Sequence, residues 1–238
     1  MMPSIFAPMM SIVDNLAAIK VRIEEATASA ERPVSSAKLI AVSKTKPMSL
    51  IHEAYEAGQR DFGENKVQEL TEKHPALPEA NWHMIGHLQR NKVKYIAPFI
   101  HLIHSVDSER LLAEINKRAA QNERIIDCLL QLNISEEDAK SGLNENTTYE
   151  LLTRLDDFPN VRIKGLMGMA ELTDDQSVVK SQFARLAKAF KRYLTLDHPR
   201  IEMEELSMGM SGDFELAIAE GATMLRIGSA VFGSRNYG

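Results

Sequence analysis

Residues 38–58, KLIAVSKTKPMSLIHEAYEAG, contain the pattern that decides the fold. The unbroken apolar run 39–42 predicts a strand that is buried on both faces. Pro47 and Gly58 bound the segment 50–57, which has a helical pattern. A buried strand followed by a helix is the repeating unit of α/β proteins with a parallel sheet.

The same alternation continues to the end of the chain. Further strands are predicted at 60–62, 82–85, 100–105, 125–133, 162–167, 204–207 and 224–227, with helices at 64–73, 89–96, 107–120, 145–156, 174–195 and 211–220. Counting the first unit, about eight strand–helix units most simply close into one (β/α)8 barrel of the TIM type. A doubly wound open sheet is the alternative.

An additional helix precedes the first strand. Its apolar residues Ile12, Leu16, Ile19 and Ile23 recur at spacings of three and four, and Ser11 is the expected N-cap. We therefore expect residues 11–238 to form one barrel domain with an extra N-terminal helix. Residues 1–10 are expected to be a flexible extension.

The composition excludes several classes of protein. Lys and Arg number 28 against 33 Asp and Glu, a net charge of −5, so nucleic acid is not an expected partner. No apolar stretch is long enough for a membrane span. The single cysteine, Cys128, rules out an intramolecular disulfide and has the apolar surroundings of an inert buried thiol. We expect a cytoplasmic protein.

Polar residues gather at the predicted carboxyl ends of the strands, where barrels of this kind place their chemistry. Period-two alternation puts Ile40, Val42 and Lys44 on one face of their strand, so Lys44 points into the barrel mouth. An amine held between apolar walls, with the cation of Lys46 nearby, would be partly neutral and nucleophilic toward a carbonyl. This predicts Schiff-base chemistry at Lys44. The alternative is a solvated lysine just past a strand end, and Lys46 is the rival nucleophile.

Two glycine-containing turns follow the last two predicted strands. One is Gly209-Met210-Ser211-Gly212-Asp213, which opens a helix, and the other is Gly228-Ser229. Barrel enzymes commonly hold phosphate at these two positions, through backbone N–H groups, hydroxyls and helix N-termini. Their place in the fold predicts a phosphorylated ligand, although either turn alone is typical of an ordinary tight turn.

Arg226 lies in the otherwise apolar last strand. Its guanidinium keeps its charge and needs hydrogen-bond acceptors when buried. Two interpretations are open: a ligand faces Arg226, or a carboxylate on a neighbouring strand, such as Glu204, pairs with it.

The histidines do not predict a metal site. His101 and His104 are three apart on one strand and so face opposite ways. His83 and His87 have no cysteine or carboxylate at ligand spacing. We expect no bound metal.

Several short motifs occur in a fixed order along the chain. They are Ala41-Val42-Ser43-Lys44-Thr45-Lys46-Pro47, Phe62-Gly63-Glu64-Asn65, Trp82-His83-Met84-Ile85-Gly86-His87-Leu88-Gln89, Asn133-Ile134-Ser135, Lys140-Ser141-Gly142, Gly165-Leu166-Met167, Leu206-Ser207-Met208-Gly209-Met210-Ser211 and Arg226-Ile227-Gly228-Ser229-Ala230-Val231-Phe232-Gly233. In these motifs the sequence resembles the pyridoxal phosphate homeostasis protein family (YggS/PROSC family, alanine racemase N-terminal-domain-like), from about Lys38 to Tyr237.

The resemblance implies a (β/α)8 barrel of the alanine racemase type that binds pyridoxal 5′-phosphate (PLP) as an aldimine on Lys44. It further implies that Arg226 faces the pyridine nitrogen. The remaining implied contacts are Ser211, Gly228 and Ser229 around the phosphate, and Asn65 and Met167 along the ring. The implied role is intracellular PLP homeostasis, by a monomer whose partners are PLP and the apo-enzymes that use it.

Two other functions compete with this one: a PLP-dependent racemase or lyase, and a lysine-dependent aldolase without cofactor. A guanidinium opposite the pyridine nitrogen makes the ring a poor electron sink, which disfavours amino-acid conversion. Racemases of this type are also described as taking a second base from an added β domain, and we expect no such domain in a chain that ends at Gly238, just past the eighth strand. Tyr237 is the alternative second base. We expect no substantial enzymatic activity.

Overall fold

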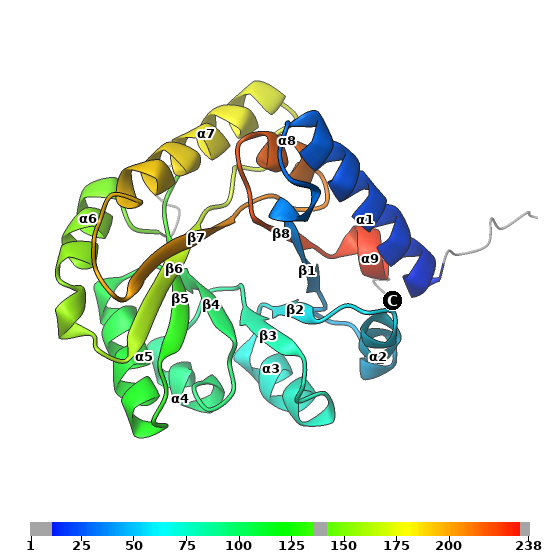
Figure 1. Ribbon diagram of the computed structural model, residues 1–238. Helices are drawn as coiled ribbons and strands as arrows, with labels where there is room; N and C mark the ends of the chain where they lie inside the picture. Colours follow the sequence, from blue (N-terminus) through cyan, green and yellow to red (C-terminus); the bar gives the residue numbers. More distant parts are fainter. Residues whose placement is uncertain (1–10, 136–141, 234–238) are drawn as a thin grey trace, which may run out of the picture.

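The computed structural model describes residues 11–135 and 142–233. Eight parallel strands form a closed barrel in sequence order, and β8 pairs with β1 to complete it (Figure 1). The open-sheet alternative is therefore wrong. The strands are β1 (Lys38–Val42), β2 (Asp61–Glu64), β3 (Asn81–Met84), β4 (Leu102–Val106), β5 (Ile126–Gln131), β6 (Val161–Met167), β7 (Ile201–Ser207) and β8 (Met224–Ile227).

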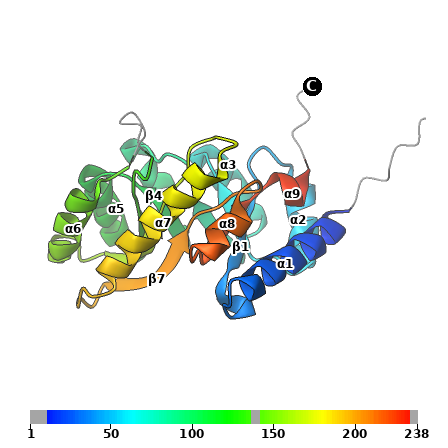
Figure 2. The same cartoon turned by 90° about the horizontal axis from the view of Figure 1, so that it is seen from above.

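Helices surround the barrel and connect its strands (Figure 2). They are α1 (Ile12–Ser29), α2 (Met48–Glu56), α3 (Val67–Lys73), α4 (Val93–Ile96), α5 (Glu109–Gln121), α6 (Glu145–Thr153), α7 (Gln176–Tyr193), α8 (Phe214–Ala219) and α9 (Ser229–Phe232). The extra helix α1 packs against α2, α8 and α9. Ser11 is its N-cap as predicted: the Ser11 hydroxyl accepts from the Asp14 N–H at 3.1 Å, and the Asp14 carboxylate accepts in return from the Ser11 N–H.

Alternate residues of each strand face the barrel interior or the helices. An interior cluster is separate from the larger core between strands and helices, and consists of Ile40, Leu102, Leu129, Met167 and Met224. The position of Ile40 in this cluster confirms the strand parity derived from the sequence.

Gly165 of β6 is required by a close approach of two strands. Its φ is +150°, and a Cβ there would lie 1.8 Å from the carbonyl oxygen of Glu205 on β7. The pairing register of β6 and β7 shifts between Ile163 and Gly165. Only glycine allows the two strands to pair through this irregularity.

Several predicted boundaries are wrong, including those of β2, β7 and α8. Glu64 ends strand β2 and does not open a helix, because its backbone stays paired with β3 at Met84. Strand β7 begins at Ile201, before the predicted residue 204. Helix α8 begins at Phe214, after a turn in which the Asp213 carboxylate accepts from the Met210 N–H at 2.5 Å. Residues 1–10, predicted to be flexible, lie outside the described part of the chain.

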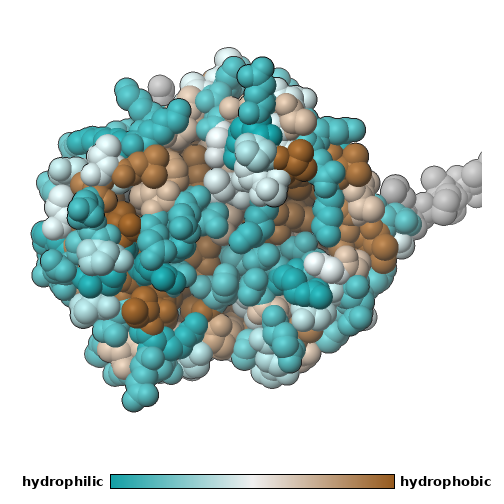
Figure 3. Space-filling model, in the orientation of Figure 1, coloured by the Kyte–Doolittle hydropathy of each residue, from teal (hydrophilic) through white to brown (hydrophobic). Residues whose placement is uncertain are grey.

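The described helices include none that combines the length and the apolar character of a membrane span. The face seen in Figure 3 is largely hydrophilic, with apolar side chains scattered in small groups. Cys128 is buried and free, as predicted, and burial raises the pKa of its thiol.

Candidate functional site

A cavity of about 350 Å³ opens at the carboxyl ends of β1, β2 and β8. Six of the seven predicted site residues line it: Lys44, Asn65, Ser211, Arg226, Gly228 and Ser229. Barrels of this type place binding sites at this end. The cavity has apolar walls, which include Val42, Ile85, Met169 and Met210. Strand parity in the sequence placed Val42 on this face, and sequence reasoning missed the other three.

Met167, the seventh predicted residue, does not line this cavity. It is fully buried in the interior cluster, next to Ile40, Leu129 and the other members. Met169, two residues further along the same segment, is half exposed and contributes to the cavity wall. The structure therefore places Met167 inside the barrel.

The loop that carries Lys44 has a strained backbone. Thr45 has a φ of +62°, a conformation that costs a β-branched residue about 1–2 kcal/mol. Two hydrogen bonds hold the turn: the Thr45 N–H donates to Glu69 Oε2 at 2.7 Å, and the Lys46 N–H donates to the Ser43 carbonyl at 3.0 Å. These contacts fix the backbone on both sides of Lys44.

A buried ionic cluster lies beneath this loop. Lys73 Nζ donates to Glu64 Oε1 and Glu69 Oε2, each at 2.8 Å, and to the Ser43 carbonyl at 2.9 Å. The Ser43 hydroxyl donates to the same Glu64 oxygen at 2.6 Å. The cluster ties the end of β1 to β2 and α3. Sequence reasoning missed Lys73 and Glu69, whose i, i+4 spacing on one helix was the available signal.

Lys46, the rival nucleophile, forms hydrogen bonds of its own with the backbone at the end of α9. Its Nζ donates to the carbonyls of Phe232 at 2.9 Å and Gly233 at 3.2 Å, at the carboxyl end of α9. Carbonyls at a helix end attract a cation. Converting the Lys46 ammonium to a neutral or substituted amine would weaken these contacts, which favours Lys44 as the reacting lysine.

The two predicted glycine turns meet at the cavity. Gly228 is the N-cap position of α9, and a Cβ there would lie 3.2 Å from the carbonyl oxygen of Val42. Glycine at 228 thus allows β8 and β1 to approach. Ser229 begins α9, and Ser211 and Gly212, in the turn before α8, line the same cavity. The first N–H groups of a helix have no partner within the helix and can donate to an anion.

Arg226 reaches the cavity from inside the barrel and is only 4% exposed. Its Nη1 donates to the Ser207 hydroxyl at 2.6 Å and its Nη2 to the Gly168 carbonyl at 3.0 Å. Burial lowers the pKa of Arg226 to about 10, partly offset by the charge of Asp213, so the group remains a cation at neutral pH.

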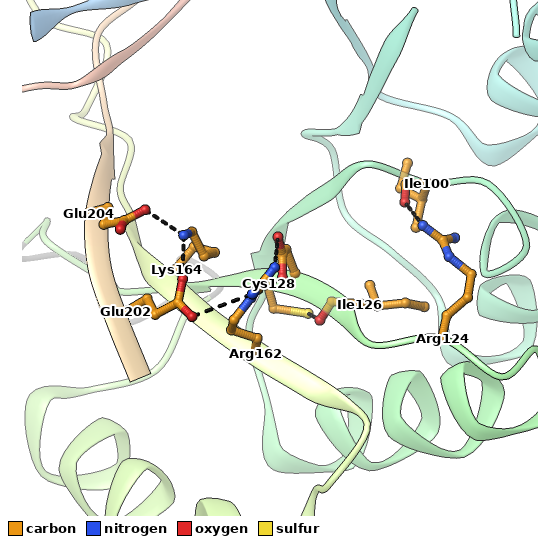
Figure 4. A network of polar contacts seen from close by, with 9 residues as sticks. Ile100, Arg124, Ile126, Cys128, Arg162, Lys164, Glu202 and Glu204 are labelled. Atoms are coloured by element: carbon orange, nitrogen blue, oxygen red, sulfur yellow. Dashed lines mark hydrogen bonds and ion pairs between the residues drawn. The ribbon is translucent and has the colours of Figure 1, made fainter. Parts of the chain in front are cut away.

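The predicted alternative, an ion pair between Arg226 and Glu204, is wrong. Glu204 of β7 pairs instead with Lys164 of β6, which also binds Glu202 at 2.6 Å (Figure 4). In the part of the chain that the structure describes, no carboxylate forms an ion pair with Arg226.

The histidines pair between strands, not along them. His83 contacts His104 in the barrel interior, and His87 contacts Asp107 at 3.1 Å. Ligand atoms of Asp61, His83 and His101 lie within 4.8 Å of one another at the opposite end of the barrel from the cavity. The hydrogen bond of Asp61 to His83 already uses two of these atoms. The absence of a bound metal stays a prediction.

Known proteins resemble this chain over nearly its whole length. The family described as "Alanine racemase, N-terminal domain" matches residues 15–236. A relative from Pseudomonas aeruginosa named pyridoxal phosphate homeostasis protein is 40% identical over 232 residues, covering 97% of this chain and 98% of that protein. The chain belongs to the pyridoxal phosphate homeostasis protein family.

Solved structures agree with this assignment. PipY of Synechococcus elongatus PCC7942, solved with PLP bound, is 36% identical and has a TM-score of 0.80, covering 94% of this chain and 100% of that one. Alanine racemase from Bartonella henselae is 18% identical, with a TM-score of 0.68, and covers 94% of this chain and 58% of that one. The second likeness shows the common barrel fold.

Glu64 makes the stability of the folded protein depend on pH. Burial raises the pKa of Glu64 to about 7, against the opposing effects of Lys73 and Ser43. The folded protein therefore binds a proton that the unfolded chain releases near pH 4.5, and stability falls as the pH rises from about 4.5 to 7.

In Glu64→Gln we expect this fall in stability to be smaller by on the order of 1–3 kcal/mol. Urea unfolding of both proteins between pH 4.5 and 8 measures the difference, and parallel stability curves would contradict it.

Proposed function

We propose that this protein binds PLP in the cavity at the end of β1, β2 and β8, and serves intracellular PLP homeostasis without substantial conversion of amino acids. The observation that carries the proposal is the gathering of Lys44, Arg226 and the two serines Ser211 and Ser229 around one cavity of about 350 Å³. The name of the Pseudomonas aeruginosa relative and the PLP in the PipY structure support it.

The residues present fit each part of PLP. The amine of Lys44 can bond covalently to an aldehyde carbon, while Lys46 remains on the carbonyls of α9. Ser211, Ser229 and the N–H groups at Gly228 and after it offer donors for a phosphate dianion. When bound, PLP supplies a reactive aldehyde and a ring that can delocalise electrons.

Arg226 limits the chemistry of this site. A guanidinium that stays cationic disfavours protonation of a pyridine nitrogen facing it, since two positive charges would then lie side by side. Of the described residues that line the cavity, Lys44, Lys46 and Arg226 are the ones with titratable side chains, and none is histidine, tyrosine or an acid. Conversion of an amino acid through a carbanion needs a strong electron sink or well-placed bases.

This arrangement suits a protein that takes up and releases its cofactor. Free amines can compete with Lys44 for the aldehyde. The described cavity lining contains no histidine, tyrosine or acidic side chain that could act as a base and convert a bound amino acid. The apo forms of PLP-dependent enzymes are the receivers consistent with this role. We further propose that the protein acts as a monomer in the cytoplasm, with Asn65 beside the ring and Met167 supporting the floor from within the barrel.

The first prediction identifies the covalent site. Borohydride reduction of the PLP-loaded protein should place a pyridoxyl group on Lys44, because Lys46 is held by Phe232 and Gly233. Lys44→Ala should stay colourless with PLP, and Lys46→Ala should still turn yellow. Peptide mapping by mass spectrometry reads the site, and a label mainly on Lys46 would refute the assignment.

The second prediction concerns the phosphate. Ser211→Ala/Ser229→Ala should weaken PLP binding roughly ten- to hundredfold, the scale of hydrogen bonds to a charged group, and leave binding of pyridoxal, which has no phosphate, nearly unchanged. Ser105→Ala is the control, because the Ser105 hydroxyl is buried without a partner. Equal losses for PLP and pyridoxal would show that the phosphate lies elsewhere.

The third prediction separates a carrier from an enzyme. The loaded protein is incubated with each proteinogenic amino acid in deuterated water, and exchange of the Cα proton is followed by NMR. We expect no exchange on the seconds timescale typical of enzymes, because Arg226 weakens the electron sink. Exchange at such rates would support the racemase or lyase alternative.

A further inference from the structure

A line of polar side chains crosses the barrel interior behind Arg226, and none of its members lines the PLP cavity. The Ser207 hydroxyl lies 2.9 Å from His104 Nδ1, and His104 Nε2 lies 2.9 Å from His83 Nδ1. His83 Nε2 lies 3.1 Å from Asp61 Oδ1. Ser207, His104 and His83 are completely buried. The line joins β8, β7, β4, β3 and β2.

The two ends of the line fix the direction of every hydrogen bond. Arginine only donates, so Ser207 accepts from Arg226 and its own proton goes to His104 Nδ1. A neutral His104 then carries its proton on Nε2 and donates to His83 Nδ1. His83 in turn carries its proton on Nε2 and donates to the carboxylate of Asp61. All donors therefore point from the cation to the anion.

Both histidines in the line are neutral. Burial lowers the pKa of His104 well below its usual range, and the charge of Arg226 acts in the same direction. Burial also lowers the pKa of His83, although the bond to Asp61 opposes the effect. A second proton on His104 would reverse its bond to Ser207 and place a cation next to Arg226. The neutral, one-directional arrangement is the stable one.

The far end of the line meets solvent. Asp61 is partly exposed and lines a second cavity, of about 580 Å³, at the amino ends of β1 and β2. Asn81 also donates to the Asp61 oxygen that accepts from His83, at 3.1 Å. Although burial alone would raise it, the pKa of Asp61 is lowered by His83 and by Lys38, so this end stays anionic.

We propose that Ser207, His104, His83 and Asp61 are positioning residues for Arg226, forming a polarised hydrogen-bond chain that links the guanidinium to a carboxylate at the opposite end of the barrel. The chain orients Arg226 toward the PLP cavity and stabilises its charge through aligned dipoles. A fully satisfied polar line of this kind also specifies one arrangement of the interior, since each member has a single compatible proton position.

Other charged groups lie near the two ends of the line. Lys38, Arg124 and Asp127 lie near His101 at the amino end of the barrel, and Asp213 acts on Arg226 at the other end. Asp127 is the matched control for Asp61. It lies near the amino end of β5, is partly buried, and pairs with Arg162, which is not part of the hydrogen-bond chain.

The first experiment uses the unaltered protein without cofactor. With 15N-labelled histidine, NMR at pH 7 should show His83 and His104 neutral and protonated on Nε2. Ser207→Ala removes the donor to His104 and should shift the ring-nitrogen signals of both histidines, including His83, which Ser207 does not touch. Ser105→Ala, next to His104 in sequence, should leave both unchanged. A proton on Nδ1 of either histidine, or an unshifted His83 in Ser207→Ala, would overturn the proposal.

The second experiment rests on the proposed function and measures PLP affinity. Ser207→Ala should weaken binding about tenfold, the scale of one hydrogen bond to a charged group, and Ser207→Thr, which keeps the hydroxyl, should restore it. Asp61→Asn should weaken binding from across the barrel, and Asp127→Asn should not. Equal effects of the two acid variants would refute coupling through the chain. If the unaltered protein fails to bind PLP, the proposed function is wrong. The NMR experiment still tests whether the hydrogen-bond chain exists.

Discussion

A positive charge enclosed in the barrel interior is the constraint on which the rest of the site depends. An uncompensated charge in such a place costs several kcal/mol, and Arg226 has no ion-pair partner among the described residues. The interior therefore combines an apolar cluster with a polar line that begins at Ser207 and Gly168. Most barrels of this kind fill these layers with branched apolar side chains. Here the packing of the interior serves the orientation of one guanidinium.

A second network supports the loop after β1, the strand next to β8. The cluster of Glu64, Glu69 and Lys73 holds the turn at Thr45, whose strained backbone would otherwise relax. Lys44 is thus presented from a fixed loop, and Arg226 from a fixed strand. Because each wall has its own hydrogen-bonded support, the cavity needs no ligand to assemble it, which lowers the entropic cost of binding. Preorganisation of this kind favours tight binding.

The barrel could be read from the sequence because its signals are local: apolar runs, helical periodicity, and the parity that aligns Ile40 with Lys44. The side-chain networks could not be read because they depend on register between strands. Glu204 is an example. Its partner Lys164 lies on β6, in a stretch where the register between β6 and β7 shifts, so strand parity alone does not predict which charged group Glu204 meets. The contact of His83 with His104 has no comparable signal in the sequence.

The placement of the histidines also bears on what the cavity can do. Imidazole is the usual proton-transfer group near neutral pH, and this barrel encloses two of them close to a proposed cofactor site. Both are engaged at each ring nitrogen and lie behind Arg226, on the side away from the cavity. All their hydrogen bonds lie within the line that supports the Arg226 guanidinium. The charge of Arg226 in turn disfavours protonation of a ring nitrogen that faces it. The same interior line that stabilises the cation thus removes the nearest imidazoles from reach of a bound ligand, so that structural support of Arg226 and restraint of its chemistry have one physical origin.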